Sequence, residues 1–281
     1  MLIKDVIAIC KKNSSGVNQW TNLPISDATT RDQVLYGNTN QECTGIMVTL
    51  FASIEVIKKA KEEGCNFIIC HEALFWNHGD HTDWLKDNET FKLKTELLGD
   101  MCVWRNHDYI HSFIDVGETF ADGVFYGLMN ELGWRDNLVG DVSRPRFYHF
   151  DKIPVREFAQ SIMDKINLTG IKCMGDLDGY VENVYLPSHV DGRSDNEILE
   201  TCEKNHIDTV IAMEITDYTL SEYIRDGAQL GLNKRVLAVG HFNMEEPGMK
   251  YYSEYLPSIL GNDIKIRFMY SGDAYKFVIN K

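Results

Sequence analysis

Short apolar runs alternate with amphipathic segments along both halves of the chain. Residues 2–11 have the apolar spacing of a helix, and residues 44–50 form an apolar run typical of a buried strand. Ser53 can cap the next helix, which Gly64 ends, and a second strand is predicted at 66–70. This strand–helix–strand order favours parallel pairing of the two strands through a right-handed crossover.

The same alternation continues to the end of the chain. Residues 13–42 are polar and turn-rich, and residues 72–86 form an aromatic-rich loop, so we expect irregular structure in both. Further helices are predicted at 88–99 and 118–132, from Pro154, from a capping box at Ser194 to near Asn205, at 219–231 and from Pro247 to Leu260. Further strands are predicted at 101–104, 146–150, 170–174, 181–186, 209–212, 236–240, 263–269 and 275–279.

Composition narrows the class of protein. A hydrophobic content of 44% over 281 residues supports a sizeable core, and a net charge of −14 argues against a nucleic-acid binder. No run approaches the roughly 18 apolar residues of a membrane span, and an acid at Asp5 argues against a signal peptide. Seven cysteines without a C-x-x-C pair indicate reduced thiols, so we expect a cytoplasmic protein.

Metal-ligating side chains follow three of the predicted strands. His71 and Glu72 end the first, His107 follows another just beyond Trp104, and His241 ends a third. Ligands collect at the carboxyl ends of strands in open α/β sheets, and imidazole with carboxylate suits a divalent transition metal. One histidine at a strand end is usually structural, but three such ends indicate a metal site.

Spacing leaves several assignments open. His107 and His111 lie four residues apart, as do His111 and Asp115, so spacing alone does not select the central ligand. His241 and Glu245 are also four apart, although Glu245 could instead stabilise the start of the helix predicted from Pro247. The remaining histidines are interpreted as loop or incidental residues: His78, His81, His149, His189 and His206.

The residues around His241 carry a family resemblance. The segment from Gly240 to Gly248 has the pattern Gly-His-x-x-x-Glu followed by Gly. It resembles the NGG-interacting-factor-three-like family of dinuclear metal-centre, toroidal hexamers, often described as type 2 GTP cyclohydrolase. His71-Glu72 stands where that family has His-His, and His111 stands where it has a metal-binding aspartate. These departures exchange a histidine and a carboxylate within a five-ligand set.

The resemblance implies two divalent ions per chain, zinc, iron or manganese. The implied ligands are His71, Glu72, His111, His241 and Glu245. His107 would be a further ligand or an acid/base, and Asp108 and Glu214 would orient ligands or move protons. The implied activity is hydrolysis of a C–N bond in a small heterocyclic or nucleotide-like substrate by a homohexamer.

Two other classes of function remain open. One is a non-catalytic metal carrier, metal-insertion factor or hexameric regulator, and the other is a single structural metal site. Phe75, Trp76 and Trp84 could wall a pocket for a flat substrate or pack in the core.

We therefore predict an α/β protein of two lobes with mixed sheets flanked by helices. Residues 1–106 with 247–281 would form the first lobe and residues 107–246 the second, with the metal site at the strand ends between them.

Overall fold

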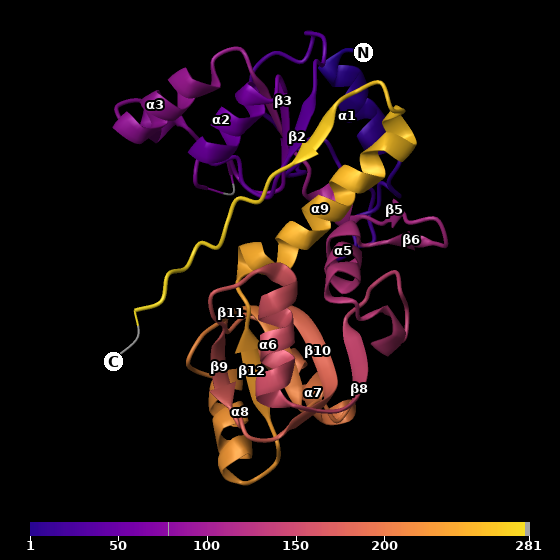
Figure 1. The fold of residues 1–281 in the computed structure, drawn as a ribbon, viewed down its shortest axis with the longest axis vertical. Helices are drawn as coiled ribbons and strands as arrows, with labels where there is room; N and C mark the ends of the chain where they lie inside the picture. The colour runs from indigo at the N-terminus through magenta and orange to yellow at the C-terminus, as the bar shows by residue number, and fades with distance from the viewer. Residues whose placement is uncertain (78, 279–281) are drawn as a thin grey trace. The chain divides into compact units, whose positions relative to one another are not determined.

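The computed structural model describes residues 1–77 and 79–278, which form two α/β units with mixed sheets flanked by helices, as predicted (Figure 1). Unit 1 comprises Met1–Gly127 and Gly248–Ser271, and unit 2 comprises Leu128–Pro247 and the segment from Gly272. The first boundary therefore lies at Gly127 and not at residue 106. The reason is that the turn beginning at His107 hydrogen-bonds back to Asp32 of unit 1.

Unit 1 is built on a five-stranded sheet of order β1-β4-β3-β2-β13. Its strands are β1 (Val34–Tyr36), β2 (Ile46–Val48), β3 (Phe67–Cys70), β4 (Cys102–Arg105) and β13 (Ile266–Phe268). All neighbours are parallel except β1, which pairs antiparallel with β4 at the edge. This unit also contains α1 (Ile3–Lys12), α2 (Ile54–Glu62), α3 (Glu89–Leu98), the short α4 (Asp108–His111) and the 3-10 turn η1 (Asp83–Leu85).

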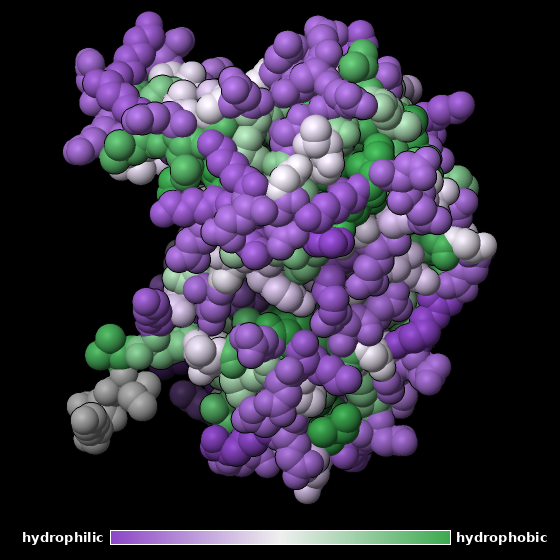
Figure 2. All heavy atoms as spheres, turned by 45° about the horizontal axis from the view of Figure 1, so that its top comes forward, coloured by the Kyte–Doolittle hydropathy of each residue, from purple (hydrophilic) through white to green (hydrophobic). Residues whose placement is uncertain are grey.

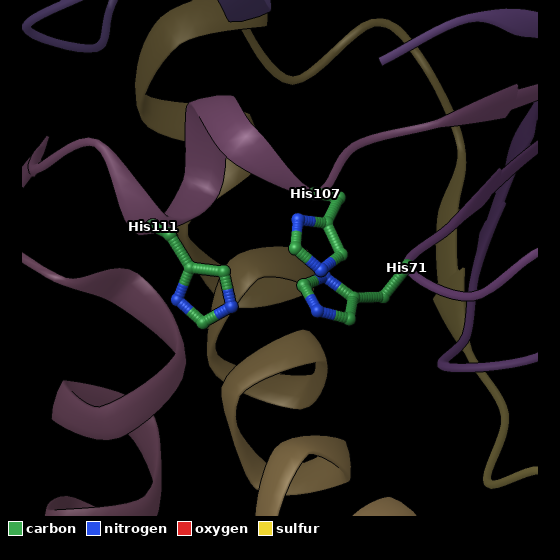
Figure 3. Close-up of side chains that lie close together, drawn as sticks. All are labelled: His71, His107 and His111. Carbon is green, nitrogen blue, oxygen red and sulfur yellow. The ribbon is translucent and has the colours of Figure 1, made fainter. Parts of the chain in front are cut away.

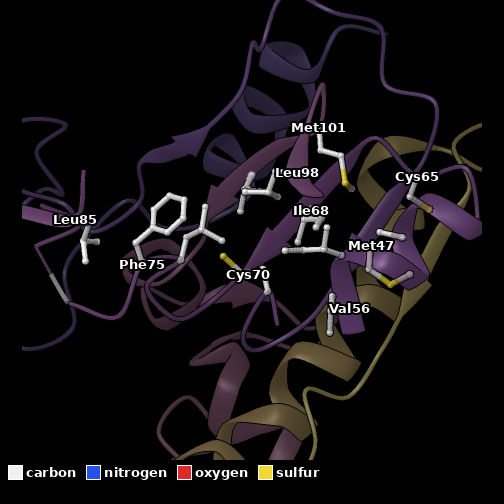
Figure 4. Packing of buried hydrophobic residues seen from close by; sticks show 14 residues of the cluster. Met47, Val56, Cys65, Ile68, Cys70, Phe75, Leu85, Leu98 and Met101 are labelled. Carbon is white, nitrogen blue, oxygen red and sulfur yellow. The ribbon is translucent and has the colours of Figure 1, made fainter. Parts of the chain in front are cut away.

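The crossover from β2 to β3 forms as its sequence predicts. Ser53 caps α2 by accepting a hydrogen bond from the backbone N–H of Val56, and Gly64 follows the helix with φ of 72°. The buried side of α2 packs against the sheet, α3 lies beside it on the same face, and α1 lies on the other face (Figure 1). Figure 4 shows this core, in which Met47 and Ile68 of neighbouring strands belong to one buried cluster with Val56 and Leu98 of the helices.

Unit 2 is built on a six-stranded sheet of order β7-β8-β10-β11-β12-β9. Its strands are β7 (Leu138–Val139), β8 (Phe147–Pro154), β9 (Lys172–Gly175), β10 (Tyr180–Val190), β11 (Thr209–Ile215) and β12 (Arg235–Ala238). The central strands β10, β11 and β12 are parallel, and the outer pairs are antiparallel. The helices are α6 (Val155–Ile166), α7 (Asp195–Lys204), α8 (Leu220–Gln229) and the 3-10 turn η2 (Arg135–Asn137).

Several short elements were not predicted. Strand β1 lies in the segment expected to be irregular, a hairpin forms from β5 (Ile114–Asp115) and β6 (Phe120–Ala121), and β7 pairs with β8. Strands of two or three residues are too short to show a periodicity, so the strand with which they pair defines them and not their own sequence. The strand predicted at 275–279 was wrong for residues 275–278, which have no regular structure, and its last residue lies outside the described ranges.

The start of one helix and the cap of another differ from prediction. Helix α9 (His241–Leu260) begins before Pro247, since the N–H of Met244 already bonds the carbonyl of Gly240. Proline at the seventh position lacks the N–H for one helix bond, and its ring crowds the carbonyl of Asn243, so the helix continues there at a cost in stability. The Ser194 side chain does not cap α7, and Asp195 instead accepts hydrogen bonds from the backbone N–H groups of Gly192 and Leu220.

The surface is mainly polar. On the face drawn in Figure 2, hydrophilic residues predominate and hydrophobic residues form scattered patches. Among the described residues, no helix combines the length and apolar character that crossing a membrane requires. All seven cysteines are free thiols, and Cys173 alone among them is exposed.

Candidate metal centre

Three histidines of unit 1 converge beyond the carboxyl ends of β3 and β4. His71 directly follows β3, and His107 and His111 lie at either end of α4. Figure 3 shows the three rings turned towards one another. The ring centroid of His71 lies 4.5 Å from that of His107 and 5.1 Å from that of His111. One nitrogen from each ring lies within 4.8 Å of the others, a spacing that a single ion could bridge.

Each of these rings has its Nδ1 atom engaged by an oxygen that can only accept. The contacts are His71 to the Asn106 carbonyl at 3.0 Å, His107 to Asp108 at 2.9 Å and His111 to Asp122 at 3.0 Å. A carbonyl or carboxylate partner places the ring hydrogen on Nδ1. Nε2 is then the nitrogen that each ring offers to a cation, as in most protein sites where histidine binds a metal.

Asp122 accepts hydrogen bonds from several groups besides His111. It is fully buried and bonds His111, the side-chain amide of Gln19 at 2.8 Å and the backbone N–H of Val124 at 3.1 Å. It therefore caps α5 (Gly123–Leu132) and orients an imidazole with the same carboxylate. Sequence reasoning missed this residue, although an aspartate just before the glycine that opens a helix was a usable signal.

Asp32 and Asp108 hold the other end of α4. Asp32 accepts the backbone N–H groups of His107 and Asp108, each at 2.8 Å, and burial raises its pKa to about 6. Burial also acts to raise the pKa of Asp108, but its bonds to the His107 ring, to the Arg31 backbone and to the Thr30 hydroxyl outweigh burial and lower it. Asp108 thus lies where it can orient His107, and its catalytic role stays a prediction.

The two carboxylates considered as ligands in unit 1, those of Glu72 and Asp115, differ in burial. Glu72 is half-buried, and its backbone N–H and that of His71 both donate to the carbonyl of Leu50 at 2.9 Å. Asp115 is exposed on β5 and accepts the N–H of Gly117. The cluster in this unit therefore contains His111 and not Asp115, while Glu72 is not one of its three members.

A second cluster lies in unit 2, where His241 opens α9. Its Nδ1 bonds the carboxylate of Glu214 on β11, and its Nε2 lies 3.2 Å from Glu245 one turn further along the helix. His189 of β10 is the direct cross-strand neighbour of Glu214 and bonds it at 2.7 Å. The sequence offers no partner for His189 and so marks it as incidental, but the register of β10 and β11 gives it Glu214.

The two carboxylates of this second cluster favour a positive charge on His241. Burial alone would lower the pKa of His241, but the carboxylates of Glu214 and Glu245 outweigh it and raise that pKa to about 11. Burial would raise the pKa of Glu214, but His189 and His241 outweigh it and lower that pKa to about 2. A divalent cation bound by His241 would have to displace this proton, and the two carboxylates would then offset the charge of the cation.

The other histidines lie away from both clusters. His81 is exposed in the loop after β3, His149 bonds Asn183, and His206 is exposed after α7. His78 lies outside the described residues.

Comparison with known proteins identifies the family of this chain. A family model described as Duf34/NIF3 (NGG1p interacting factor 3) matches residues 17–273. The chain belongs to the Duf34/NIF3 family. Its Gly240–Gly248 segment, with His241 at the start of a helix, is the stretch in which the sequence showed the resemblance.

Curated relatives and solved structures extend the match. A Clostridium perfringens protein named "GTP cyclohydrolase 1 type 2 homolog" is 24% identical over 251 residues, covering 86% of this chain and 87% of the relative. A Bacillus cereus protein related to NIF3 has a TM-score of 0.70 at 11% identity, covering 100% of this chain and 99% of that one. A Staphylococcus aureus hypothetical protein has a TM-score of 0.69 at 15% identity, with 99% of both chains covered. These solved structures support the fold.

Replacing Asp122 tests the three-histidine cluster. Asp122→Asn keeps an oxygen that can cap α5 but removes the charge that orients His111, so the affinity for Zn²⁺ should fall by roughly 10- to 100-fold. Competition with a chromophoric chelator measures this affinity. Asp115→Asn is the matched control and should leave it unchanged. A loss in Asp115→Asn without a loss in Asp122→Asn would move the central ligand to Asp115.

Proposed function

We propose that this protein is a metal-dependent hydrolase with a dinuclear centre, acting on a C–N bond of a small heterocyclic or nucleotide-like substrate. The observation that carries the proposal is the convergence of three imidazoles whose Nδ1 atoms are all engaged by acceptors. The names of the curated relatives, both "GTP cyclohydrolase 1 type 2 homolog", support the reaction class. The substrate of this chain stays a matter of proposal.

The proposed ligands come from both units. Unit 1 would supply His71, His111 and Glu72, with His107 as a further ligand because its ring is part of the cluster. Unit 2 would supply His241 and Glu245. Imidazole and carboxylate donors suit zinc, iron or manganese. That the two sets form one centre follows from the family resemblance and is part of the proposal.

A bound pair of divalent ions would supply Lewis-acid polarisation of the scissile group and a more acidic water. The chain's own residues would orient the donors: the Asn106 carbonyl, Asp108 and Asp122 each fix one imidazole. Glu214 would fix His241 and exchange a proton with His189, whose side chain is 43% exposed. In the hydrolysis, the C–N bond breaks, carbon gains the hydroxyl group and the leaving nitrogen gains a proton.

A flat substrate has a surface to stack on beside the unit 1 cluster. Trp20 is 58% exposed, and its ring centroid lies 5.4 Å from that of His111 and 6.5 Å from that of His107. The neighbouring Gln19 is buried and bonds Asp122, which anchors this segment of the loop. An exposed aromatic ring held beside candidate ligands favours a heterocyclic substrate over an extended chain.

Turnover separates the hydrolase from a metal carrier or a hexameric regulator. The metal-loaded protein should hydrolyse at least one member of a heterocycle and ester panel, and His71→Ala should lose that activity. His206→Ala, an exposed histidine outside both clusters, should keep it. A protein that turns over nothing but transfers its metal to an acceptor would be a carrier, and the hydrolase proposal would be wrong.

A further inference from the structure

A buried lysine in unit 1 takes no part in the candidate metal clusters. Lys94 lies on α3 and is 2% exposed. Its ammonium donates to the carbonyl of Leu74 at 2.8 Å and lies 4.5 Å from the ring centroid of Phe51, 5.8 Å from that of Phe75 and 5.7 Å from that of Trp76. Within the described part of the chain, no carboxylate forms an ion pair with it.

This environment is unusual for an ammonium group. Carbonyl and aromatic partners stabilise a cation only in part, and a buried charge is costly unless it is fully paired. Burial accordingly lowers the pKa of Lys94 to about 8. An anion placed beside the ammonium would supply the partner that the protein does not.

Space for such an anion exists. Lys94 lines a cavity of about 320 Å³, a volume within the range of small-molecule sites. Phe51, Ile54 and Trp76 form apolar parts of its wall. Hydroxyl groups come from Ser53, Thr90 and Ser271, and the exposed Glu55 adds one carboxylate. The cavity therefore combines apolar walls, three hydroxyls and the buried cation of Lys94, with the carboxylate of Glu55 on its exposed side.

The surrounding backbone favours negative charge as well. Ser53 is the N-cap of α2, Ile54 is its first residue, and Thr90 lies in the first turn of α3. Two helix N-termini thus border the same cavity, and the backbone N–H groups and dipole at such an end attract anions. Lys94 adds a full positive charge to these partial ones.

Trp76 is held at the cavity in a strained conformation. Its φ is 65°, a region that bulky residues rarely occupy, and its side chain remains 43% exposed. Phe75, its neighbour, is buried in the core instead, and Trp84 in the same loop is 68% exposed and does not line the cavity. Of the three aromatics considered from sequence as pocket walls, the structure places Trp76 in that position.

We propose that this cavity binds a small organic anion in which a carboxylate or phosphate is attached to a flat ring. Lys94 would pair with the anionic group, and Phe51 and Trp76 would hold the ring. The proposal rests on unit 1 alone and does not depend on the hydrolase activity or on bound metal.

Four probes test the two halves of this claim by calorimetric titration of the full-length protein. Benzoate and phenyl phosphate carry both a ring and a charge, benzyl alcohol lacks the charge, and inorganic phosphate lacks the ring. At least one of the first two should bind roughly tenfold or more tightly than both of the others. Which one binds better identifies the anionic group. Equal binding of benzyl alcohol would overturn the role of the charge, and equal binding of inorganic phosphate that of the ring.

Variants then locate the binding. Lys94→Met and Trp76→Leu should each weaken the binding of the better probe by roughly tenfold. Lys92→Met, on the same helix with its side chain 59% exposed, and Trp84→Leu are the matched controls and should bind as the parent does. Because Trp76 is partly exposed, its variant decides the question even if Lys94→Met does not fold. Unchanged affinity in Trp76→Leu and in folded Lys94→Met would remove the site from this cavity.

Discussion

His71→Ala should lose most of its bound divalent metal and keep its fold. His71 is fully buried at the end of β3, and its Nδ1 already bonds the Asn106 carbonyl, so its contribution to a cation is made through Nε2. Removing one of three convergent imidazoles should weaken binding on the order of 100-fold or more. Elemental analysis after dialysis, with circular dichroism to confirm folding, measures both quantities.

The corresponding change in unit 2 is His241→Ala, which should also lose metal while remaining folded. If one dinuclear centre uses both units, either variant should reduce the content of both ions. If the clusters bind separately, each variant should lose only its own ion. His81→Ala, in an exposed loop, is the control and should retain the parent's metal content. Unchanged metal content in both His71→Ala and His241→Ala would remove the site from these strand ends.

Gly248→Ala should destabilise the protein by about 3 kcal/mol or more. A Cβ atom added there would lie 2.4 Å from the Cα of Val124 and 2.7 Å from its carbonyl oxygen. Both are backbone atoms, so no side-chain rotation can relieve the clash and α9 must move away from α5. The glycine that follows the Gly-His-x-x-x-Glu pattern is therefore needed for close helix packing. Urea unfolding measures the loss.

Gly227→Ala provides the control for that substitution. Gly227 lies in α8, and the atoms nearest to an added Cβ would belong to the flexible Lys234 side chain, at 3.4 Å. Alanine is the better helix former by up to about 1 kcal/mol, so this variant should be neutral or slightly stabilised. Equal stability of the two alanine variants would contradict the steric explanation.

Much of the fold could be predicted because its signals are local. Ser53 and Gly64 mark the ends of α2, and the apolar runs on either side became parallel neighbours. The start of α9 could not be predicted in the same way. Pro247 is a strong local signal, but the helix is set by Gly240, whose φ of 108° ends the strand and whose carbonyl starts the first turn.

The site shows the same division between local and tertiary information. His71, His107 and His111 could be grouped because each follows a strand, and carboxyl ends of parallel strands lie together. Their orienting partners depend on pairing between distant segments. Asp32 reaches His107 from before β1, and His189 meets Glu214 only through the register of β10 and β11. The assignment of ligands therefore stays a prediction.

Anomalous diffraction from crystals of the protein purified without chelators tests the central claim most directly. We expect one ion bound by the Nε2 atoms of His71, His107 and His111. A second ion should lie roughly 3.5–4 Å away, bound by His241 and Glu245. Crystals of metal-replete protein with no ion at the three histidines, or with a single ion elsewhere, would contradict the dinuclear centre.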